Sequence, residues 1–281
     1  MIQVKGLRKT YGPFRLEIDM EIPAGRVTGL VGRNGAGKST TIKALLGLIR
    51  PEAGEIRILG KPVEALTAED KEQIGAAFSD SGFSNFLKLR DVVRILRSSY
   101  RGFDEGWFLE ACRKGGLPMD KPLKDFSTGM KARLRFLTAC SHGAKLLVLD
   151  EPTAGLDVVA RGELMDVLRE YLAEDSERTV LISSHISTDL EGICDDIYMI
   201  ADGRVVLHED TDRILSDYAV LRLSEKAYEE IDKDYILQTK KEPFGYTCLT
   251  DQRRYYAENY PEIVIESGSI DELILVMAKE A

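Results

Sequence analysis

The chain has 281 residues, with 38 basic and 47 acidic side chains, and therefore a formal net charge of −9. Hydrophobic residues account for 44% of the sequence and charged residues for 30%, which excludes disordered, collagen-like and disulfide-stapled chains. The length allows one large domain with an appendage, or two modest domains. An acidic balance without a long basic tract is unlike that of a nucleic-acid-binding protein, so no nucleic-acid partner is expected.

Neither a membrane span nor a cysteine-based site is indicated. No apolar run approaches the roughly eighteen residues that cross a bilayer, and the first residues lack the apolar segment of a signal peptide. The four cysteines lie far apart without a Cys-x-x-Cys pair, which favours buried thiols over a zinc or redox site. We therefore expect a cytoplasmic protein that crosses no membrane itself.

Two kinds of strand pattern appear along the chain. Three early runs alternate apolar and polar side chains, as half-buried strands do, and predict an antiparallel edge. These runs are residues 2–4, 16–22 and 55–59. Three other runs are apolar throughout, which is typical of strands covered on both faces of a parallel sheet. These runs are residues 27–31, 146–149 and 180–182.

A helical pattern follows each buried run, which predicts an α/β core with right-handed crossovers. Its apolar positions are Ile42, Leu45, Leu46 and Ile49, then Leu164, Leu168 and Leu172, then Ile186, Leu190 and Ile193. Residues 83–143 show only helical spacing and predict an inserted helical subdomain. From about residue 216 the composition of the chain changes. Near its end, Ser269 and Glu272 predict a capping box at the start of a last helix. A tail of about 65 residues makes a marginal core alone, so we expect it to dock on the main domain or on a partner.

A phosphate-binding loop is the strongest motif. Residues 32–40 match G-x-x-x-x-G-K-[ST] between a predicted buried strand and a predicted helix. In such a loop, backbone N–H groups and the helix N-terminus surround phosphate, Lys38 reaches the β- and γ-phosphates, and the Ser39 hydroxyl holds Mg²⁺. The predicted ATP-binding residues of this loop are Gly32, Asn34, Gly35, Ala36, Gly37, Lys38, Ser39 and Thr40. A chance match in a glycine-rich turn is the alternative, and the flanking strand and helix disfavour it.

Two adjacent carboxylates end the second buried run. At the carboxyl end of a parallel strand, Asp150 can face Mg²⁺ directly or through water, and Glu151 can act as the general base on the attacking water. The alternative is a pair of acidic residues that merely begin the turn at Pro152. The phosphate-binding loop upstream favours the catalytic interpretation.

With these motifs, residues 1–215 resemble the ATP-binding subunits of ABC transporters. Residues 126–130 resemble the signature of that family, usually Leu-Ser-Gly-Gly-Gln, with Ser127 and Gly129 matching and the other three positions departing. A helix N-terminus with a hydroxyl can contact a γ-phosphate, and glycine leaves the approach open. As an alternative, Ser127 is simply a helix N-cap.

The resemblance implies three further site residues. Asp157, in Ala-Gly-Leu-Asp, lies in the segment that resembles the D-loop, which couples two subunits. His185 resembles the switch histidine that bonds the γ-phosphate, and Tyr11 stands where the family stacks an aromatic ring on adenine. The ordinary alternatives are a structural histidine and a turn tyrosine.

One position departs from the family. The Q-loop glutamine is expected after residues 74–78, but Ser79 and Asp80 follow instead. Asp80 could replace the glutamine as a ligand on the magnesium side, or Ser79 could do so through water. Exporter-type members carry acidic residues in this loop, so the resemblance favours export over import.

The predicted fold class is thus α/β. A P-loop NTPase core would have a mainly parallel sheet, an antiparallel β edge, an inserted helical subdomain at about 83–143 and a small α+β appendage at 216–281, of regulatory or dimer-supporting role. The resemblance implies an ATPase that sandwiches two ATP molecules between two subunits, with a homodimer favoured over a heterodimer. It also implies Mg²⁺, a transmembrane permease subunit and a peripheral position on the cytoplasmic face of the cell membrane.

Two rival functions are weaker. A soluble ABC-type ATPase acting on nucleic acid or ribosomes usually carries coiled-coil insertions, tandem ATPase units or basic tracts, none of which this chain shows. A P-loop kinase would need an acceptor site and a basic lid, and no such constellation stands beside the signature.

Overall fold

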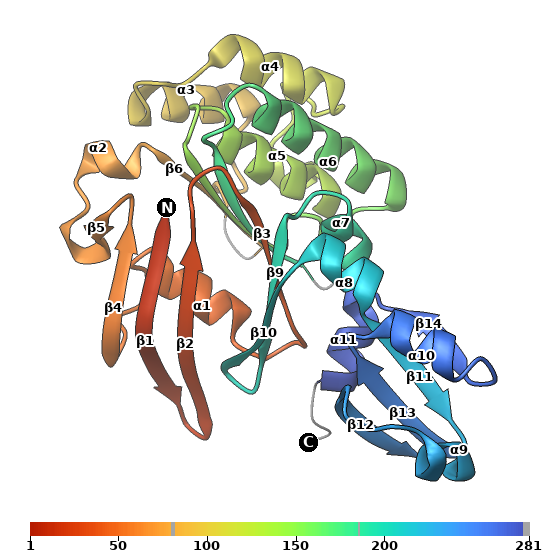
Figure 1. Cartoon of the computed structure of the whole chain (residues 1–281). Helices are drawn as coiled ribbons and strands as arrows, with labels where there is room; N and C mark the ends of the chain where they lie inside the picture. The colour runs from red at the N-terminus through yellow and green to blue at the C-terminus, as the bar shows by residue number, and fades with distance from the viewer. Residues whose placement is uncertain (80–81, 185, 278–281) are drawn as a thin grey trace.

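The computed structural model describes residues 1–79, 82–184 and 186–277. A ten-stranded mixed sheet with the order β5-β4-β1-β2-β10-β9-β3-β8-β7-β6 forms the main domain, and helices cover it (Figure 1). A separate four-stranded sheet is formed by the tail. The α/β class with a P-loop NTPase core is confirmed.

The predicted antiparallel edge is present. It consists of β1 (Ile2–Tyr11), β2 (Phe14–Ile22), β4 (Ala53–Ile58) and β5 (Lys61–Pro62), and each neighbouring pair in this edge runs antiparallel. Inward-facing side chains alternate with outward-facing ones along β1, so the sheet buries one face there, as the sequence pattern requires.

The parallel centre contains β3 (Val27–Val31), β8 (Thr179–Ser183), β7 (Leu146–Asp150) and β6 (Ile74–Phe78). The first three strands are buried at every position, as the continuous apolar runs predict. The sequence pattern did not predict β6 as a strand. Packing requires glycine at position 75, because a Cβ there would lie 2.2 Å from the carbonyl oxygen of Ala139.

Two further strands, β9 (Asp196–Ala201) and β10 (Arg204–Asp210), were also not predicted. β9 pairs with β3 in parallel and with β10 in antiparallel, while β10 touches β2. These strands therefore join the antiparallel edge to the parallel centre in one sheet.

The predicted crossover helices follow their strands: α1 (Lys38–Leu45) after β3, α6 (Val158–Ala173) after β7 and α7 (Ser187–Glu191) after β8. The apolar pattern continues to Ile49, but α1 ends at Leu45 and Gly47 adopts a positive φ of 67°. The helix ends there because the chain turns into a left-handed conformation that favours glycine.

Helices also fill the insertion. They are α3 (Leu89–Ser99), α4 (Glu105–Lys114) and α5 (Thr128–Cys140), and a short α2 (Ala68–Lys71) precedes β6. α3 and α4 lie at one end of the molecule (Figure 1). Phe108 of α4 and Phe136 of α5 are fully or almost fully buried in the same apolar cluster.

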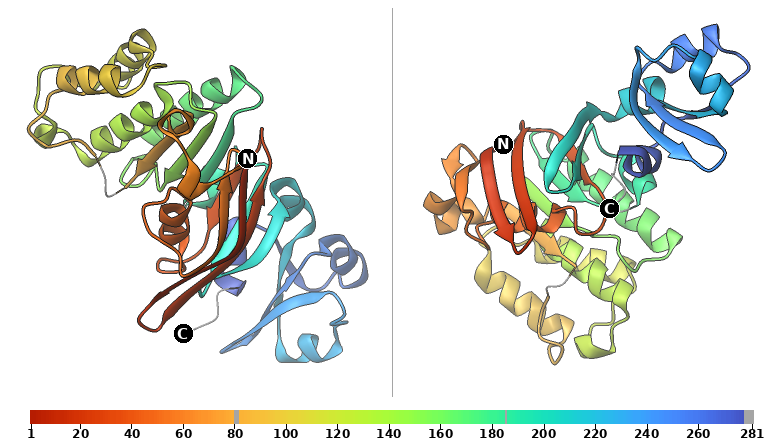
Figure 2. Two further views of the ribbon diagram at one scale, coloured as in Figure 1. Left: turned by 90° about the vertical axis from the view of Figure 1, so that its left-hand side faces the viewer. Right: turned by 90° about the horizontal axis from the view of Figure 1, so that it is seen from below.

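The tail forms a sheet in the order β12-β13-β11-β14, and helices pack around it (Figures 1 and 2). α8 (Thr211–Asp217) crosses the boundary between the main domain and the tail. The tail elements after it are β11 (Ala219–Leu223), α9 (Glu225–Glu230), β12 (Ile236–Glu242), β13 (Gly245–Thr250), α10 (Arg253–Asn259), β14 (Val264–Ser267) and α11 (Ile270–Met277). Leu221 and Tyr256 belong to a small core of its own. Val220 and Leu273 instead belong to the core cluster of the main domain, so the tail docks there.

The start of the last helix and the cysteines are placed as the sequence predicts. Ser269 Oγ accepts a hydrogen bond from the Glu272 N–H at 3.2 Å, at the start of α11. All four cysteines are free and buried, and burial raises the pKa of the Cys112 thiol to about 12. Among the residues that the structure describes, no helix is both long and apolar enough to cross a membrane.

A pH-sensitive contact joins the end of α3 to the segment that follows α5. The rings of Tyr100 and His142 stack with centroids 4.1 Å apart. Burial lowers the pKa of His142 from its ordinary value of 6.5, although the backbone at Ile74 and Thr138 favours the charged ring. Below pH 6.5 the unfolded chain therefore takes up this proton more readily than the folded chain. The free energy of unfolding consequently decreases as the pH is lowered.

His142→Phe keeps the ring stack and removes the titration. We expect the drop in melting temperature between pH 7 and pH 5 to be smaller in this variant than in the wild type. Thermal unfolding at both pH values measures the difference, and an equal drop in the two proteins would contradict a neutral buried His142.

Candidate functional site

The loop between β3 and α1 is shaped by its glycines. Gly32, Gly35 and Gly37 have φ angles of 146°, 83° and 117°, which L side chains rarely adopt. A Cβ on Gly32 would lie 2.1 Å from the carbonyl oxygen of Ile200, and one on Gly37 would lie 2.6 Å from Leu16 Cδ1. The loop thus rests tightly on the sheet while its other side opens to a cavity.

Lys38, the first residue of α1, folds back over this loop. Its Nζ donates to the carbonyl oxygen of Gly32 at 2.7 Å and lies 3.9 Å from Glu151 Oε1. Burial lowers the pKa of Lys38, while the carboxylates of Glu151 and Asp150 act in the opposite direction. A buried cation held by backbone carbonyls at a helix N-terminus is suited to bind the phosphates of a nucleotide.

Three oxygen-bearing side chains meet beside Lys38. Ser39 Oγ donates to Asp150 Oδ1 at 3.2 Å, and Ser183 Oγ donates to the same oxygen at 2.6 Å. Ser183 was not predicted as a site residue; its signal is its place at the end of β8, opposite Asp150 in the parallel register. A hydroxyl and a carboxylate are ligands that Mg²⁺ accepts, with water and substrate phosphates completing its shell.

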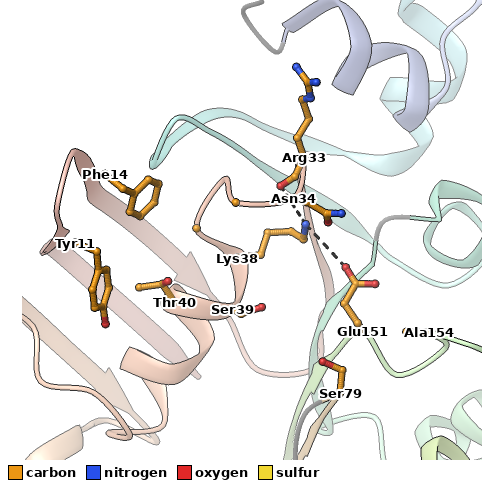
Figure 3. A pocket seen from close by; sticks show the side chains of 12 residues that line it. Tyr11, Phe14, Arg33, Asn34, Lys38, Ser39, Thr40, Ser79, Glu151 and Ala154 are labelled. Atoms are coloured by element: carbon orange, nitrogen blue, oxygen red, sulfur yellow. Dashed lines mark hydrogen bonds and ion pairs between the residues drawn. The ribbon is translucent and has the colours of Figure 1, made fainter. Parts of the chain in front are cut away.

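Glu151 has an unusual backbone. Its φ of 52° lies in the left-handed region, which costs free energy for a residue with a side chain and is common at functional sites. The Glu151 N–H donates to Ser183 Oγ at 3.0 Å and lies 3.2 Å from the Ser183 carbonyl oxygen. This conformation turns the carboxylate towards Lys38 and into the cavity (Figure 3).

Gly35, Gly37, Lys38, Ser39 and Glu151 line one cavity of about 510 Å³. Its lining residues are Tyr11, Phe14, Arg33, Asn34, Gly35, Gly37, Lys38, Ser39, Thr40, Ser79, Glu151 and Ala154. Tyr11 and Phe14 lie on one side of the loop, and Glu151 and Ser79 lie on the other (Figure 3). The cavity therefore has an aromatic end and a charged end, as a nucleotide with a base and phosphates requires.

Some of the predicted residues lie beside this cavity rather than in its wall. Gly32, Ala36 and Asp150 shape the site without lining this cavity: the Ala36 carbonyl oxygen accepts from the Gly203 N–H at 3.1 Å. Phe14 and Arg33 line it but were not predicted. Arg33 adjoins two predicted residues in sequence, and Phe14 follows Tyr11 by three residues. Asp80 and His185 lie outside the described residues.

Ser127 and Gly129 lie in a different place. Ser127 caps α5, since its Oγ accepts from the Met130 N–H at 3.1 Å, so the N-cap alternative describes its contact within one chain. A Cβ on Gly129 would lie 3.1 Å from Leu156 Cδ2. Asp157 caps α6 by accepting from the Ala160 N–H at 2.8 Å. The signature and the D-loop segment are thus packed together.

This second region has a cavity of its own, of about 560 Å³, lined by Ser127, Gly129 and Asp157 among others. Within the described part of the chain, it shares no lining residue with the cavity around Lys38. One chain therefore presents the phosphate-binding loop and the signature as two separate surfaces.

Comparisons with known proteins agree with this geometry. The family model described as "ABC transporter" matches residues 16–154. The lantibiotic transport ATP-binding protein SrtF of Streptococcus pyogenes is 35% identical over 216 residues, which are 75% of this chain and 92% of that protein. The chain belongs to the ABC transporter family.

Other members have related names. The bacitracin transport ATP-binding protein BcrA of Enterococcus faecalis is 32% identical over 73% of this chain and 68% of its own length. The Nod factor export ATP-binding protein I of Burkholderia orbicola is 32% identical over 73% of this chain and 69% of its own length.

Solved structures of ABC transporter proteins share the fold. An ATP-binding subunit of an ABC transporter superposes with a TM-score of 0.67 at 29% identity, covering 76% of this chain and 91% of that one. CbiO1 of Clostridium perfringens, part of the transporter complex cbiONQ, gives a TM-score of 0.61 at 28% identity, covering 77% and 90%.

The chain is therefore an ATP-binding ABC transporter subunit with ATPase activity, and the predicted resemblance is confirmed. The alternative of a non-transport ATPase on nucleic acid or ribosomes is not favoured, because the relatives above are named as transport proteins.

Proposed function

We propose that this subunit powers export through a separate transmembrane permease, from a peripheral position on the cytoplasmic face of the cell membrane. Export as the direction of transport is supported by the name of the Nod factor export relative. The observation that carries the proposal is the pair of separate surfaces around Lys38 and Ser127, whose cavities share no lining residue in the part of the chain that the structure describes.

In the proposed cycle, two copies pair head to tail. Each Lys38 loop then binds ATP against the partner's signature, so the same patch is used twice, as in closed dimers. Val158 and Val159, next to Asp157, are 75% and 72% exposed, and pairing would remove this apolar surface from water. We propose a homodimer, since one chain supplies both halves; pairing with a different ATP-binding subunit is the alternative.

Each residue then has a proposed role. Lys38 and the backbone of the loop bind phosphate, Ser39 and Asp150 hold Mg²⁺, Tyr11 stacks on adenine, and Glu151 takes a proton from the attacking water. Ser127 and Gly129 contact the γ-phosphate of the partner's nucleotide, and Asp157 couples the subunits. The role of His185 at the γ-phosphate and of Asp80 near Mg²⁺ rests on the family resemblance.

We propose a division into an ATP-binding domain at 1–215, with its helical insertion at 83–143, and an appendage at 216–281. The separate order of the tail sheet supports this division. Because part of the tail belongs to the main apolar cluster, we propose that the appendage regulates the ATPase rather than acting as an independent domain.

A groove of about 1060 Å³ is the proposed dock for the permease. It is lined by residues after α1, by the end of β6 and by the end of α3, including Leu46, Leu48, Ile49, Phe78 and Tyr100. Leu48 is 60% exposed. Phe78 directly precedes Ser79, which lines the nucleotide cavity, so a segment bound in the groove would adjoin the ATP site through the end of β6.

Leu48→Glu tests this dock. We expect the variant to lose co-purification with a protein of several membrane spans from detergent-solubilised native membranes, because a charge disfavours an apolar contact. ATP hydrolysis by the purified subunit alone should stay within about twofold, since Leu48 lies outside the ATP cavity. Leu237→Glu, at an exposed leucine of β12, is the matched control.

The outcomes separate the two parts of the proposal. Equal recovery of the membrane protein with Leu48→Glu and with Leu237→Glu would rule out the groove as the dock. If the wild type recovers no protein with several membrane spans, the proposed transport function itself is wrong.

A further inference from the structure

The last helix of the tail reaches back onto the main domain. α11 buries Ile270 and Leu273 completely, and both belong to one apolar cluster with Leu190 of α7 and Met199 of β9. α11 follows the last strand of the tail sheet in the chain. Its face with Ile270 and Leu273 nevertheless packs on the ATPase core. The tail is therefore attached next to elements that build the nucleotide site.

A polar contact holds the start of α11. The Ile270 N–H donates to Oε1 of Glu191 at 3.1 Å. Glu191 is the last residue of α7, and a carboxylate at a helix N-terminus stabilises that helix. α7 and α11 are thus joined by both an apolar and a polar contact.

A cavity of about 320 Å³ separates α11 from the phosphate-binding loop. Its walls are Ile274 of α11, residues 32–36 of the loop and residues 199–202 at the end of β9, together with Phe14. Ile274 is also packed against the main apolar cluster. The side chain thus faces the outer surface of the loop whose inner surface lines the cavity around Lys38.

The end of β9 lies between α11 and the phosphate-binding loop. The Gly203 N–H donates to the Ala36 carbonyl oxygen, and Gly32 has room only for hydrogen against the Ile200 carbonyl oxygen. The loop therefore rests on the segment from Ile200 to Gly203. Residues 200–202 of this segment line the same cavity as Ile274. Leu273 of α11 and Met199 of β9 belong to one apolar cluster, so a shift of α11 would reach the loop through β9 and the segment that follows it.

We propose that Ile274 is a positioning residue for the phosphate-binding loop, so that docking of α11 sets the ATP affinity of the subunit. The proposal deepens the proposed nucleotide site and rests on it. Because coupling between two sites is reciprocal, bound ATP also stabilises the docked α11. The appendage then regulates ATP binding from inside the same chain, and any partner that pulls on the tail changes ATP affinity.

The test compares Ile274→Ala with Leu275→Ala in the full chain. The two residues are neighbours on α11, but Leu275 is 69% exposed and lines neither cavity. We expect Ile274→Ala to raise the Kd for ATP and the KM by about threefold to tenfold with kcat unchanged. Leu275→Ala should leave both constants unchanged. All measurements are made well below the melting temperature of each variant.

Hydrogen exchange provides an independent readout. In the wild type, ATP should slow amide exchange at residues 273–277 and leave the exchange of β12 unchanged. A purely structural role for Ile274 would lower the melting temperature without changing Kd or this protection, and would overturn the proposal. Equal effects of the two substitutions on Kd would overturn it as well. Failure of the wild type to bind ATP would instead overturn the nucleotide site and the inference together.

Discussion

Replacing Glu151 with glutamine is expected to lower kcat for ATP hydrolysis at least about 100-fold, the usual effect of removing a general base. Glutamine has the same shape but cannot accept the proton of the attacking water. The backbone bonds of Glu151 to Ser183 do not involve its side chain, so the loop should keep its conformation. The Kd for ATP should stay within about threefold, because Lys38 and Ser39 are untouched.

The same variant should accumulate a dimer in the presence of ATP and Mg²⁺. Contacts to the γ-phosphate favour closure only while that phosphate is present, and slow hydrolysis preserves them. Light scattering coupled to gel filtration measures the mass with and without ATP. Glu170→Gln, at an exposed carboxylate on α6, is the control and should remain fully active. Normal turnover by Glu151→Gln would remove Glu151 from its proposed role.

The second large effect is expected from mixing two inactive variants. Lys38→Ala should weaken ATP binding at least about 30-fold, because a buried charge-assisted contact to phosphate is lost. Ser127→Arg should keep ATP binding but block the approach of the partner's γ-phosphate. Each variant alone should therefore hydrolyse ATP at a small fraction of the wild-type rate. Lys121→Ala, at an exposed lysine, controls for loss of one positive charge.

In an equal mixture, half of the dimers are mixed, and each has one site with an intact loop and an intact signature. The mixture should recover about a quarter of wild-type activity if the two sites act independently. A site formed within one chain would give no recovery, because each chain carries its own defect.

Loss of the helix cap at Ser127 must be separated from loss of a phosphate contact. Ser224 is a matched control, because its Oγ also caps a helix, accepting from the Ala227 N–H at 3.1 Å. Ser224→Arg should cost a similar amount of stability, about 1 kcal/mol, and leave ATPase activity unchanged. If it abolished activity as Ser127→Arg does, the contact between subunits would lose its support.

The sequence predicted the structural elements whose formation depends on residues close to one another in the chain. The phosphate-binding loop, its buried strand and the helix after it could be recognised because glycine spacing, a continuous apolar run and a helical pattern are all written within about twenty residues. The same holds for the antiparallel edge, whose alternating side chains reflect burial on one face. The capping serine before α11 is a local signal too.

Strands with weak local signals were missed. β6 carries glycine and alanine, which are poor strand formers by themselves, and the close approach of α5 explains its Gly75. Ser183 has no motif around it, and its role beside Asp150 appears once β7 and β8 pair in parallel register. Phe14 reaches the nucleotide cavity because β2 begins beside the loop.

By itself, then, the sequence determined the chemistry of this protein: a lysine and a serine at a phosphate-binding loop, two carboxylates after a buried strand, and a family signature. Only the tertiary structure decided how these parts are distributed in space. It separates the loop from the signature and brings α11 of the tail to the outer side of the loop. The reason is physical: motifs depend on neighbours in the chain, whereas contacts between distant segments depend on packing of the whole core.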